Sequence, residues 1–363
     1  MKRTIVTLLA ICLAVCVVGS PAAAEDMTAY PSLKDFYAPY FDFGSAMSSK
    51  EAADADRLAF YAAQYAIITP ENELKPQSVI DEYNSSKAAK SDPGSVALHF
   101  ASVKPLLEFA KANGLKVNGH VLFWHQQTPD TFFREGYARS KPYVSRDIML
   151  ARMENYVRLV MEYLNANYPG IVVSFDVVNE AIDDSTGTLR ESNYTKIVGD
   201  DWVTQAFRFA RKYAPEGMLL VYNDYSVPYQ PKLSGILSLL DELMRENLVD
   251  VCGMQCHYQL TTPTTAQFRS AIDNIIRKGL KIRVSEMDIL VDDYTDASFA
   301  RQASRYADFM KVLLRYADSV IAVQTWGTFD SKSWKSGQYP LLFTGGGSAK
   351  PAFYALTDPS ILP

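Results

Sequence analysis

The chain alternates between strand-like and helix-like segments through most of its 363 residues. Its apolar runs are rich in β-branched residues and short for helices, whereas the stretches between them show helical periodicity. Two of those stretches end at a glycine stop signal, at Gly114 and at Gly170. The predicted strands cover residues 40–47, 65–72, 116–125, 171–182, 218–225, 249–257, 281–290 and 320–330. Eight such alternations predict an α/β fold, a single-domain (β/α)8 TIM barrel.

Polar or aromatic side chains cluster at the carboxyl end of every predicted strand from the second to the eighth. Because barrel enzymes build their sites at this face, we expect one site there. Glu180 closes the fourth predicted strand, and Glu286 lies near the end of the seventh. A buried carboxylate costs free energy unless it is paired or used. Two carboxylates on different strands of one barrel could flank a single bond, which is the arrangement that glycoside hydrolysis requires.

Charge and cysteine spacing argue against other classes of function. The formal net charge of -5 and the lack of a basic stripe disfavour a nucleic-acid or anionic-membrane partner. Cys252 and Cys256 lie in one predicted strand, where a four-residue spacing separates Cα atoms by roughly 13 Å. A disulfide needs less than about 7 Å, so we expect two free thiols. His257 has no second pair of ligands near it, and we predict no metal and no cofactor.

The first residues are typical of an export signal. A basic start, Met1 to Arg3, precedes an apolar run that ends before the small residues Ala22 to Ala24. This pattern predicts a signal peptide over residues 1–24, a catalytic domain over 25–363, and a secreted or periplasmic protein. Lipid anchoring at Cys16 is the alternative, but Val15 is bulky for such a site and the apolar run continues past the cysteine.

Seven motifs stand at the ends of the predicted strands, in a fixed order. They are ENELK (71–75), GHVLFWHQQ (119–127), DVVNE (176–180), NDY (223–225), QCH (255–257), SEMD (285–288) and WGTFDSKSW (326–334). In order and spacing the chain resembles glycoside hydrolase family ten, the endo-β-1,4-xylanases. The resemblance extends over essentially all of residues 25–363.

The resemblance implies a retaining endo-1,4-β-xylanase that cleaves internal bonds of xylan by double displacement, and the predicted signal peptide makes it a secreted one. Glu180 would be the general acid/base and Glu286 the nucleophile. His257 would hydrogen-bond Glu286, and Asp288 would orient His257. Asn179 would contact the sugar 2-hydroxyl. A donor beside a nucleophilic carboxylate helps it stay ionised, which gives the His257 assignment a physical reason.

The resemblance also implies a set of sugar-binding residues, and it implies xylan or xylo-oligosaccharides as the partner of a monomeric protein. Trp326 and Trp334 would stack on sugar near the cleavage point. The remaining substrate-binding residues would be Glu71, Asn72, Lys75, His120, Trp124, Gln127, Tyr225 and Gln255.

Two alternatives remain at this point. A relative that cleaves glucan or mixed-linkage chains would share the fold, and Pro76, Phe329 and Cys256 depart from the family's pattern, which leaves the substrate preference open. A catalytically dead glycan-binding protein would typically have lost one catalytic carboxylate, whereas Glu180 and Glu286 are both present.

Overall fold

The computed structural model describes residues 27–335 and 337–363, so the predicted signal peptide and Cys16 lie outside the described residues. The described strands form one parallel sheet. They are β1 (Asp42–Met47), β2 (Ile67–Pro70), β3 (Lys116–Trp124), β4 (Val172–Asn179), β5 (Leu219–Asp224), β6 (Val251–Met254), β7 (His257–Gln259), β8 (Lys281–Leu290) and β9 (Val320–Thr325).

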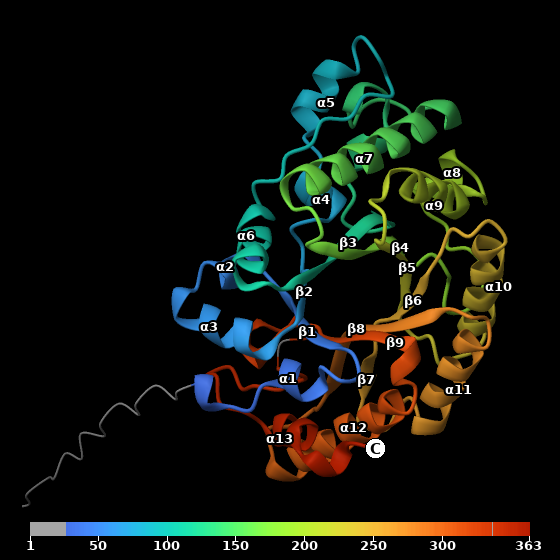
Figure 1. The fold of residues 1–363 in the computed structure, drawn as a ribbon. Coiled ribbons are helices and arrows are strands. Elements are labelled where there is room, and N and C mark those ends of the chain that lie inside the picture. The colour runs from blue at the N-terminus through green and yellow to red at the C-terminus, as the bar shows by residue number, and fades with distance from the viewer. Residues whose placement is uncertain (1–26, 336) are drawn as a thin grey trace, which may run out of the picture.

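The sheet closes on itself. Its strand order is β6-β5-β4-β3-β2-β1-β9-β8-β7, and β6 also pairs with β8, which joins the two ends. Figure 1 shows the strands as a ring with helices outside it. The strand predicted over 249–257 corresponds to β6 and ends early: the chain breaks at Gln255 and Cys256, where Cys256 has φ 65, and β7 begins at His257 and continues past the predicted range. The prediction of a single-domain (β/α)8 barrel is confirmed.

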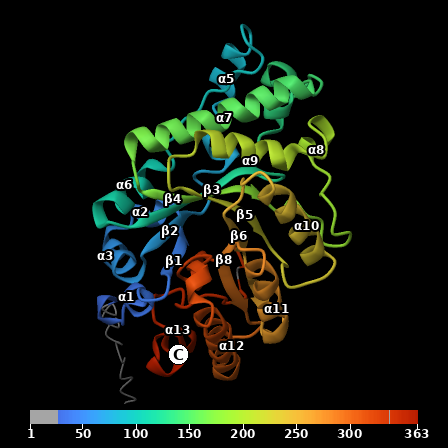
Figure 2. The same ribbon diagram turned by 45° about the vertical axis from the view of Figure 1, so that its right-hand side comes forward.

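Helices of very different length cover the outside of the barrel (Figures 1 and 2). The α-helices are α1 (Leu33–Tyr37), α2 (Ser49–Ala52), α3 (Ala55–Gln64), α4 (Pro76–Val79), α5 (Glu82–Ala88), α6 (Lys104–Asn113), α7 (Arg146–Asn167), α8 (Asn193–Ile197), α9 (Trp202–Tyr213), α10 (Lys232–Met244), α11 (Thr265–Ile276), α12 (Asp296–Leu314) and α13 (Pro351–Thr357). Short 3-10 turns are η1 (Met27–Ala29), η2 (Asp130–Phe133), η3 (Glu135–Tyr137), η4 (Ala317–Ser319), η5 (Asp330–Lys332) and η6 (Pro359–Ile361).

Local sequence explains where the longer helices begin and end. The Ser145 hydroxyl accepts from Ile148 N at the start of α7, and Thr264 forms a capping box with Gln267 at the start of α11. Helix α6 ends at Gly114, which has φ 64 as the stop signal predicted. Left-handed backbone is tolerated by glycine because it has no Cβ to clash.

Two features of the sheet bear on the expectations from sequence. Most strands end earlier than predicted, because the polar residues at their carboxyl ends already belong to loops that turn over the barrel mouth. Cys252 and Cys256 are both free and buried, as expected. Among the residues that the structure describes, none of the helices combines the length and apolarity needed to cross a membrane.

Candidate active site

A cleft of ≈ 470 Å³ lies at the carboxyl ends of the barrel strands. Its residues come from loops or strand ends of β2, β3, β4, β5, β6, β8 and β9. The lining residues are Glu71, Asn72, Lys75, His120, Trp124, His125, Gln126, Gln127, Asn179, Glu180, Arg190, Tyr225, Ser226, Gln255, His257, Glu286, Trp326 and Trp334. Every site residue predicted from the sequence is in this group except Asp288, which lies behind His257.

Glu180 directly follows β4 and projects into the cleft. Its backbone is left-handed, with φ 58, and its N–H donates to the carbonyl of Asn223 (2.9 Å). Trp124 Nε1 donates to Glu180 Oε2 at 2.9 Å, and Gln255 Nε2 donates to Oε1 at 2.9 Å. The side chain is therefore held by donors from the end of β3 and from the break between β6 and β7.

Glu286 stands inside β8 and is buried, with a rim of donors around its carboxylate. Asn223 Nδ2 donates to Oε1 at 2.8 Å, and His257 Nε2 lies 3.1 Å from Oε2. Burial raises the pKa of Glu286, but the hydrogen bond from His257 and the charges of His120 and His257 outweigh it, so the pKa lies below its usual range. Glu286 is ionised at neutral pH, which is the state that a nucleophile needs.

His257 lies between two carboxylates. Its Nε2 faces Glu286, and its Nδ1 makes a 2.9 Å ion-pair contact with Asp288 Oδ2 that lacks hydrogen-bond alignment. Burial lowers the pKa of His257, but the charges of Asp288 and Glu286 raise it to about 10 overall. Trp334 Nε1 donates to the same Asp288 oxygen at 2.8 Å. His257 is thus a cation that stabilises the charge of Glu286, and Asp288 and Trp334 hold it in place.

Three side-chain amides connect the two glutamates. Asn179 Oδ1 accepts from Asn223 Nδ2 at 3.0 Å and from Gln255 Nε2 at 3.2 Å. The same Asn223 nitrogen donates to Glu286, and the same Gln255 nitrogen donates to Glu180. Asn179 Nδ2 itself donates to Glu180 Oε1 at 3.2 Å. This amide chain (Asn179, Asn223 and Gln255) fixes the two carboxylates relative to each other.

The floor of the cleft is a buried charged cluster. His120 Nδ1 lies 2.8 Å from Asp176 Oδ2, and Arg283 NH2 donates to the same oxygen at 2.9 Å. Burial raises the pKa of Asp176, but the charge of Arg283 and the bond from His120 outweigh it and lower the pKa. His120 is thereby oriented by an ionised carboxylate, with Trp326 edge-on at 5.3 Å between ring centroids.

One end of the cleft is lined by the residues of the second and third strand loops. Lys75 Nζ donates to Asn72 Oδ1 at 2.9 Å and to Gln127 Oε1 at 2.8 Å, and lies 5.0 Å from the centre of the Trp124 ring. Burial lowers the pKa of Lys75, against the opposing charges of Glu286, Glu71 and Glu180. Burial and the charge of Glu51 raise the pKa of Glu71. These groups offer hydroxyl-binding donors and acceptors of fixed geometry.

The two tryptophans of the last strand loop differ in exposure. Trp326 is 9% exposed, whereas Trp334 is 50% exposed, and both line the cleft. A flat aromatic face suits the C–H surface of a sugar ring. Trp334 therefore has the larger ring surface free to stack on a sugar, whereas Trp326 mainly packs its ring against His120.

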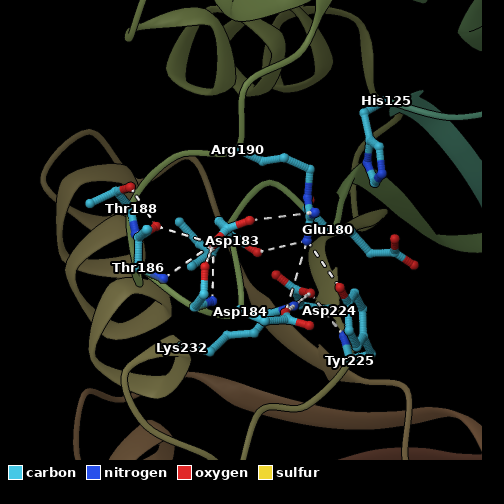
Figure 3. Close-up of polar contacts among 12 residues, drawn as sticks. His125, Glu180, Asp183, Asp184, Thr186, Thr188, Arg190, Asp224, Tyr225 and Lys232 are labelled. Atoms are coloured by element: carbon cyan, nitrogen blue, oxygen red, sulfur yellow. Dashed lines mark hydrogen bonds and ion pairs between the residues drawn. The ribbon is translucent and has the colours of Figure 1, made fainter.

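The cleft is also lined by residues that were not predicted from the sequence. His125, Arg190 and Ser226 line it beside Tyr225 (Figure 3 labels all but Ser226). Burial, together with the charges of Arg190 and Lys232, lowers the pKa of His125 to about 4, so it is neutral at pH 7. Arg190 follows Glu180 by ten residues in a polar loop, where no periodic pattern marks it. Asn223 was visible only as part of the NDY motif.

The departures from the family's pattern lie outside the cleft lining. Pro76 opens helix α4, Phe329 is buried against Phe60 at 5.9 Å between ring centroids, and Cys256 is buried behind His257. Burial raises the pKa of Cys256 to about 12, so the thiol stays protonated. Over residues 27–335 and 337–363, no group of three or more His, Cys, Asp or Glu side chains is arranged to hold a metal ion.

The arrangement provides an ionised, buried carboxylate and a second carboxylate across a polar cleft, joined by amides. One can attack a carbon while the other moves a proton to or from an oxygen, which is the chemistry of acetal hydrolysis. The open cleft with neutral amides, hydroxyl-binding groups and tryptophan faces suits an uncharged, hydroxyl-rich chain.

Comparison with known proteins agrees with this chemistry. Residues 32–359 match the family model described as glycosyl hydrolase family 10. Endo-1,4-beta-xylanase B of Butyrivibrio fibrisolvens is 36% identical over 340 residues, covering 91% of this chain and 53% of that protein. A putative endo-1,4-beta-xylanase of Caldicellulosiruptor saccharolyticus is 35% identical over 303 residues, covering 78% of this chain and 95% of that protein.

A solved structure is similar over nearly the same range. The Clostridium thermocellum N-terminal endo-1,4-beta-D-xylanase 10B, complexed with xylohexaose, has a TM-score of 0.84 at 30% identity, covering 92% of this chain and 68% of that one. The present chain spans about half the length of the Butyrivibrio relative. With a family model matching almost its whole described length, the chain belongs to glycosyl hydrolase family 10.

Proposed function

We propose that this chain is a retaining endo-1,4-β-xylanase, with Glu286 as the nucleophile and Glu180 as the general acid/base. The amide chain that joins the two carboxylates carries the proposal, because it gives each of them a different set of partners while keeping both beside one cleft. The xylanase names of the relatives, and the xylohexaose bound to one of them, support xylan as the substrate.

In the first step Glu286 attacks the anomeric carbon and the glycosidic C–O bond breaks. Glu180 gives its proton to the departing oxygen, which leaves as a hydroxyl. His257 and Asn223 stabilise the Glu286 carboxylate before attack and keep it aimed. A covalent glycosyl-enzyme ester results, and the aglycone half of the chain can leave the cleft.

In the second step Glu180, now ionised, takes a proton from water. The oxygen of that water bonds to the anomeric carbon, and the bond to Glu286 breaks. Because each step inverts the carbon, the product keeps the β configuration. The donors from Trp124 and Gln255 hold the Glu180 carboxylate in both steps.

Substrate choice is tested by comparing reducing-sugar release from xylan and from carboxymethylcellulose, with the Glu286→Gln variant as the inactive control. We expect hydrolysis of xylan and little of the cellulose derivative. Faster cleavage of the cellulose derivative or of mixed-linkage glucan would move the assignment to a glucanase. Xylan binding without hydrolysis by the wild type would identify a glycan-binding protein and overturn the catalytic assignment.

The acid role of Glu180 has a separate test. We expect Glu180→Gln to lose on the order of 10²–10⁴-fold in kcat/KM on xylan, because a glutamine cannot protonate the departing oxygen. On an aryl β-xylobioside with an acidic phenol the kcat/KM should fall far less, since that leaving group needs no proton. Equal losses on both substrates would remove Glu180 from the acid role.

We also propose that residues 1–24 direct export and that the mature enzyme acts as a monomer. The basic start, the apolar run and the Ala22 to Ala24 pattern support cleavage before residue 25. Mass spectrometry of protein recovered outside the cytoplasm should give Glu25 as the first residue. A diacylglyceryl group on Cys16 would instead establish lipid anchoring, and sedimentation of the mature protein tests the monomer.

A further inference from the structure

The residues that follow Glu180 form a short hairpin over residues 181–190, here called the acid hairpin. Ile182 and Leu189 pair as an antiparallel bridge, and Asp183 N donates to the Thr188 carbonyl at 2.9 Å. Asp183 Oδ1 also accepts from the backbone of Ser185 (3.0 Å), which closes the turn. The hairpin therefore returns the chain to the point where it left the strand, and its last residue, Arg190, ends beside Glu180.

Arg190 fastens the returning strand to the backbone of Glu180. Its N–H donates to the Ala181 carbonyl at 2.7 Å, and its Nε donates to the Glu180 carbonyl at 3.1 Å. Its NH2 group donates to the Ile182 carbonyl at 3.2 Å and to the Tyr225 hydroxyl at 3.0 Å. One guanidinium thus bonds the backbone on both sides of Ala181 and also the loop that follows β5. Figure 3 shows the contact between Arg190 and Tyr225.

The bonds to Arg190 bear on a strained backbone. Glu180 has φ 58, and a left-handed conformation is unfavourable for a residue with a Cβ because the Cβ crowds the following carbonyl oxygen. Such a conformation persists only where the surroundings over-determine it. The Glu180 N–H is held by Asn223 and its carbonyl by Arg190, so both peptide groups of Glu180 are fixed from outside its own strand.

The acid hairpin is itself anchored to helix α10. Lys232, the first residue of α10 and almost fully buried, lies 2.6 Å from Asp184 and 2.7 Å from Asp224. Its Nζ also lies 3.4 Å from the centre of the Tyr225 ring (Figure 3). At the hairpin tip, a Cβ added to Gly235 would lie 2.0 Å from the Gly187 carbonyl oxygen, so the turn sits directly on the helix. The hairpin is therefore a rigid support.

We propose that Arg190 is a positioning residue for the acid/base: it holds the left-handed backbone of Glu180 so that its carboxyl meets the departing oxygen. This inference rests on the proposed function. The charge of Arg190 is compensated by Asp183 (3.8 Å) and Asp184 (3.9 Å), so Arg190 does not offer a free cation to the substrate. Its planar guanidinium instead fixes three oxygens: the carbonyls of Glu180 and Ile182 and the hydroxyl of Tyr225.

The test uses a series of aryl β-xylobiosides that differ only in the acidity of the phenol. For Arg190→Met, we expect kcat/KM to fall about 100-fold with the least acidic phenol, since a misplaced acid costs of this order. With 2,4-dinitrophenol as leaving group, which needs no proton, the fall should be less than about 3-fold. A plot of log kcat/KM against the pKa of the phenol should therefore be steeper for Arg190→Met than for the wild type, and should approach the slope of Glu180→Gln.

Arg208→Met is the matched control, because Arg208 pairs with Glu246 on the exposed outer surface of α9. It should leave the leaving-group dependence unchanged. Arg190→Lys keeps the charge but lacks the planar fork, so we expect it to steepen the dependence as well. Circular dichroism and the thermal midpoint establish that each variant is folded before the rates are compared.

The outcomes separate the two proposals. A wild type that is inactive on xylan and on every xylobioside would overturn the proposed function. An active wild type with an Arg190→Met variant that loses the same factor across all leaving groups would overturn only the positioning role, and would make Arg190 a sugar contact or a stability residue. Full recovery of the wild-type dependence in Arg190→Lys would show that charge, rather than the fork of donors, is what matters.

Discussion

The decisive difference at the residue scale is that the two glutamates have different neighbours. Glu286 faces the cationic imidazole of His257 and the amide of Asn223, whereas Glu180 is held by the Trp124 indole and the Gln255 amide. The cationic imidazole of His257 favours the ionised form of Glu286, which is the form that its proposed role as nucleophile requires.

A small anion should restore activity to a variant that lacks the proposed nucleophile. We expect Glu286→Ala to abolish turnover and added azide to restore it with an α-glycosyl azide as product, since azide fits the space of the missing carboxylate and attacks once, with inversion. The wild-type enzyme should release the β anomer. Proton NMR that shows the α anomer as the first product of the intact enzyme would contradict the retaining mechanism.

The imidazolium of His257 should set the acidic limb of the pH profile. His257→Asn removes the cation that lowers the pKa of Glu286, so this pKa rises and the acidic limb of kcat/KM moves to higher pH. Activity at neutral pH should fall about 10- to 100-fold, as expected for a lost hydrogen bond to a charged group.

The same variant has a signature in stability. The folded-state pKa of His257 is raised to about 10, so its contribution to stability is complete below its unfolded pKa of about 6.5. The contribution disappears as pH rises through about 10. Urea unfolding at several pH values should show the stability gap between wild type and His257→Asn closing over that window. A folded variant with an unshifted acidic limb would reduce His257 to a packing role.

At the scale of elements, the site depends on how closely neighbouring strands and loops approach one another. β1 and β2 pair in register from Gly44 opposite Ile67, and a Cβ at Gly44 would lie 1.9 Å from the Ile67 carbonyl oxygen. Only glycine permits the backbones of β1 and β2 to come this close at Gly44. This close pairing positions the loops that follow both strands at the barrel mouth.

We therefore expect Gly44→Ala to destabilise the barrel by roughly 1–3 kcal/mol, the usual cost of forcing extra volume into a packed interior. Thermal unfolding should show a lower midpoint. Gly346→Ala is the matched control, because a Cβ there meets nothing closer than 3.9 Å and its backbone is not left-handed. An equal effect of the two substitutions would mean that the loss of glycine, and not the close approach, is responsible.

For the whole molecule, the groups to which we assign catalytic roles lie on one barrel face, and the proposed steps require no metal. Each of the two carboxylates accepts hydrogen bonds from the amide or imidazole groups beside it. We expect full activity after dialysis against EDTA, measured as reducing-sugar release from xylan. Complete loss that is restored by added divalent cation would contradict this mechanism, whereas a lower thermal midpoint alone would not.

The sequence by itself determined the barrel and the face of the site, and the resemblance of its motifs to a known family indicated most of the site's residues. Alternating periodicity is a local property, so strands and helices could be predicted, and parallel strands place their carboxyl ends on one face. Glu180, Glu286 and His257 stood out because each interrupts or ends an apolar strand. The structure brings them to one cleft as expected.

Only the tertiary structure decided how those residues are joined and supported. The break between β6 and β7, the amide chain through Asn223, and the return of Arg190 to the backbone of Glu180 depend on contacts between segments far apart in the sequence or on loop geometry. Loop residues show no periodic pattern from which their conformation could be predicted, and packing in three dimensions determines which groups form hydrogen bonds. For that reason Arg190 and Lys232, which lack a motif of their own, became visible only in the folded chain.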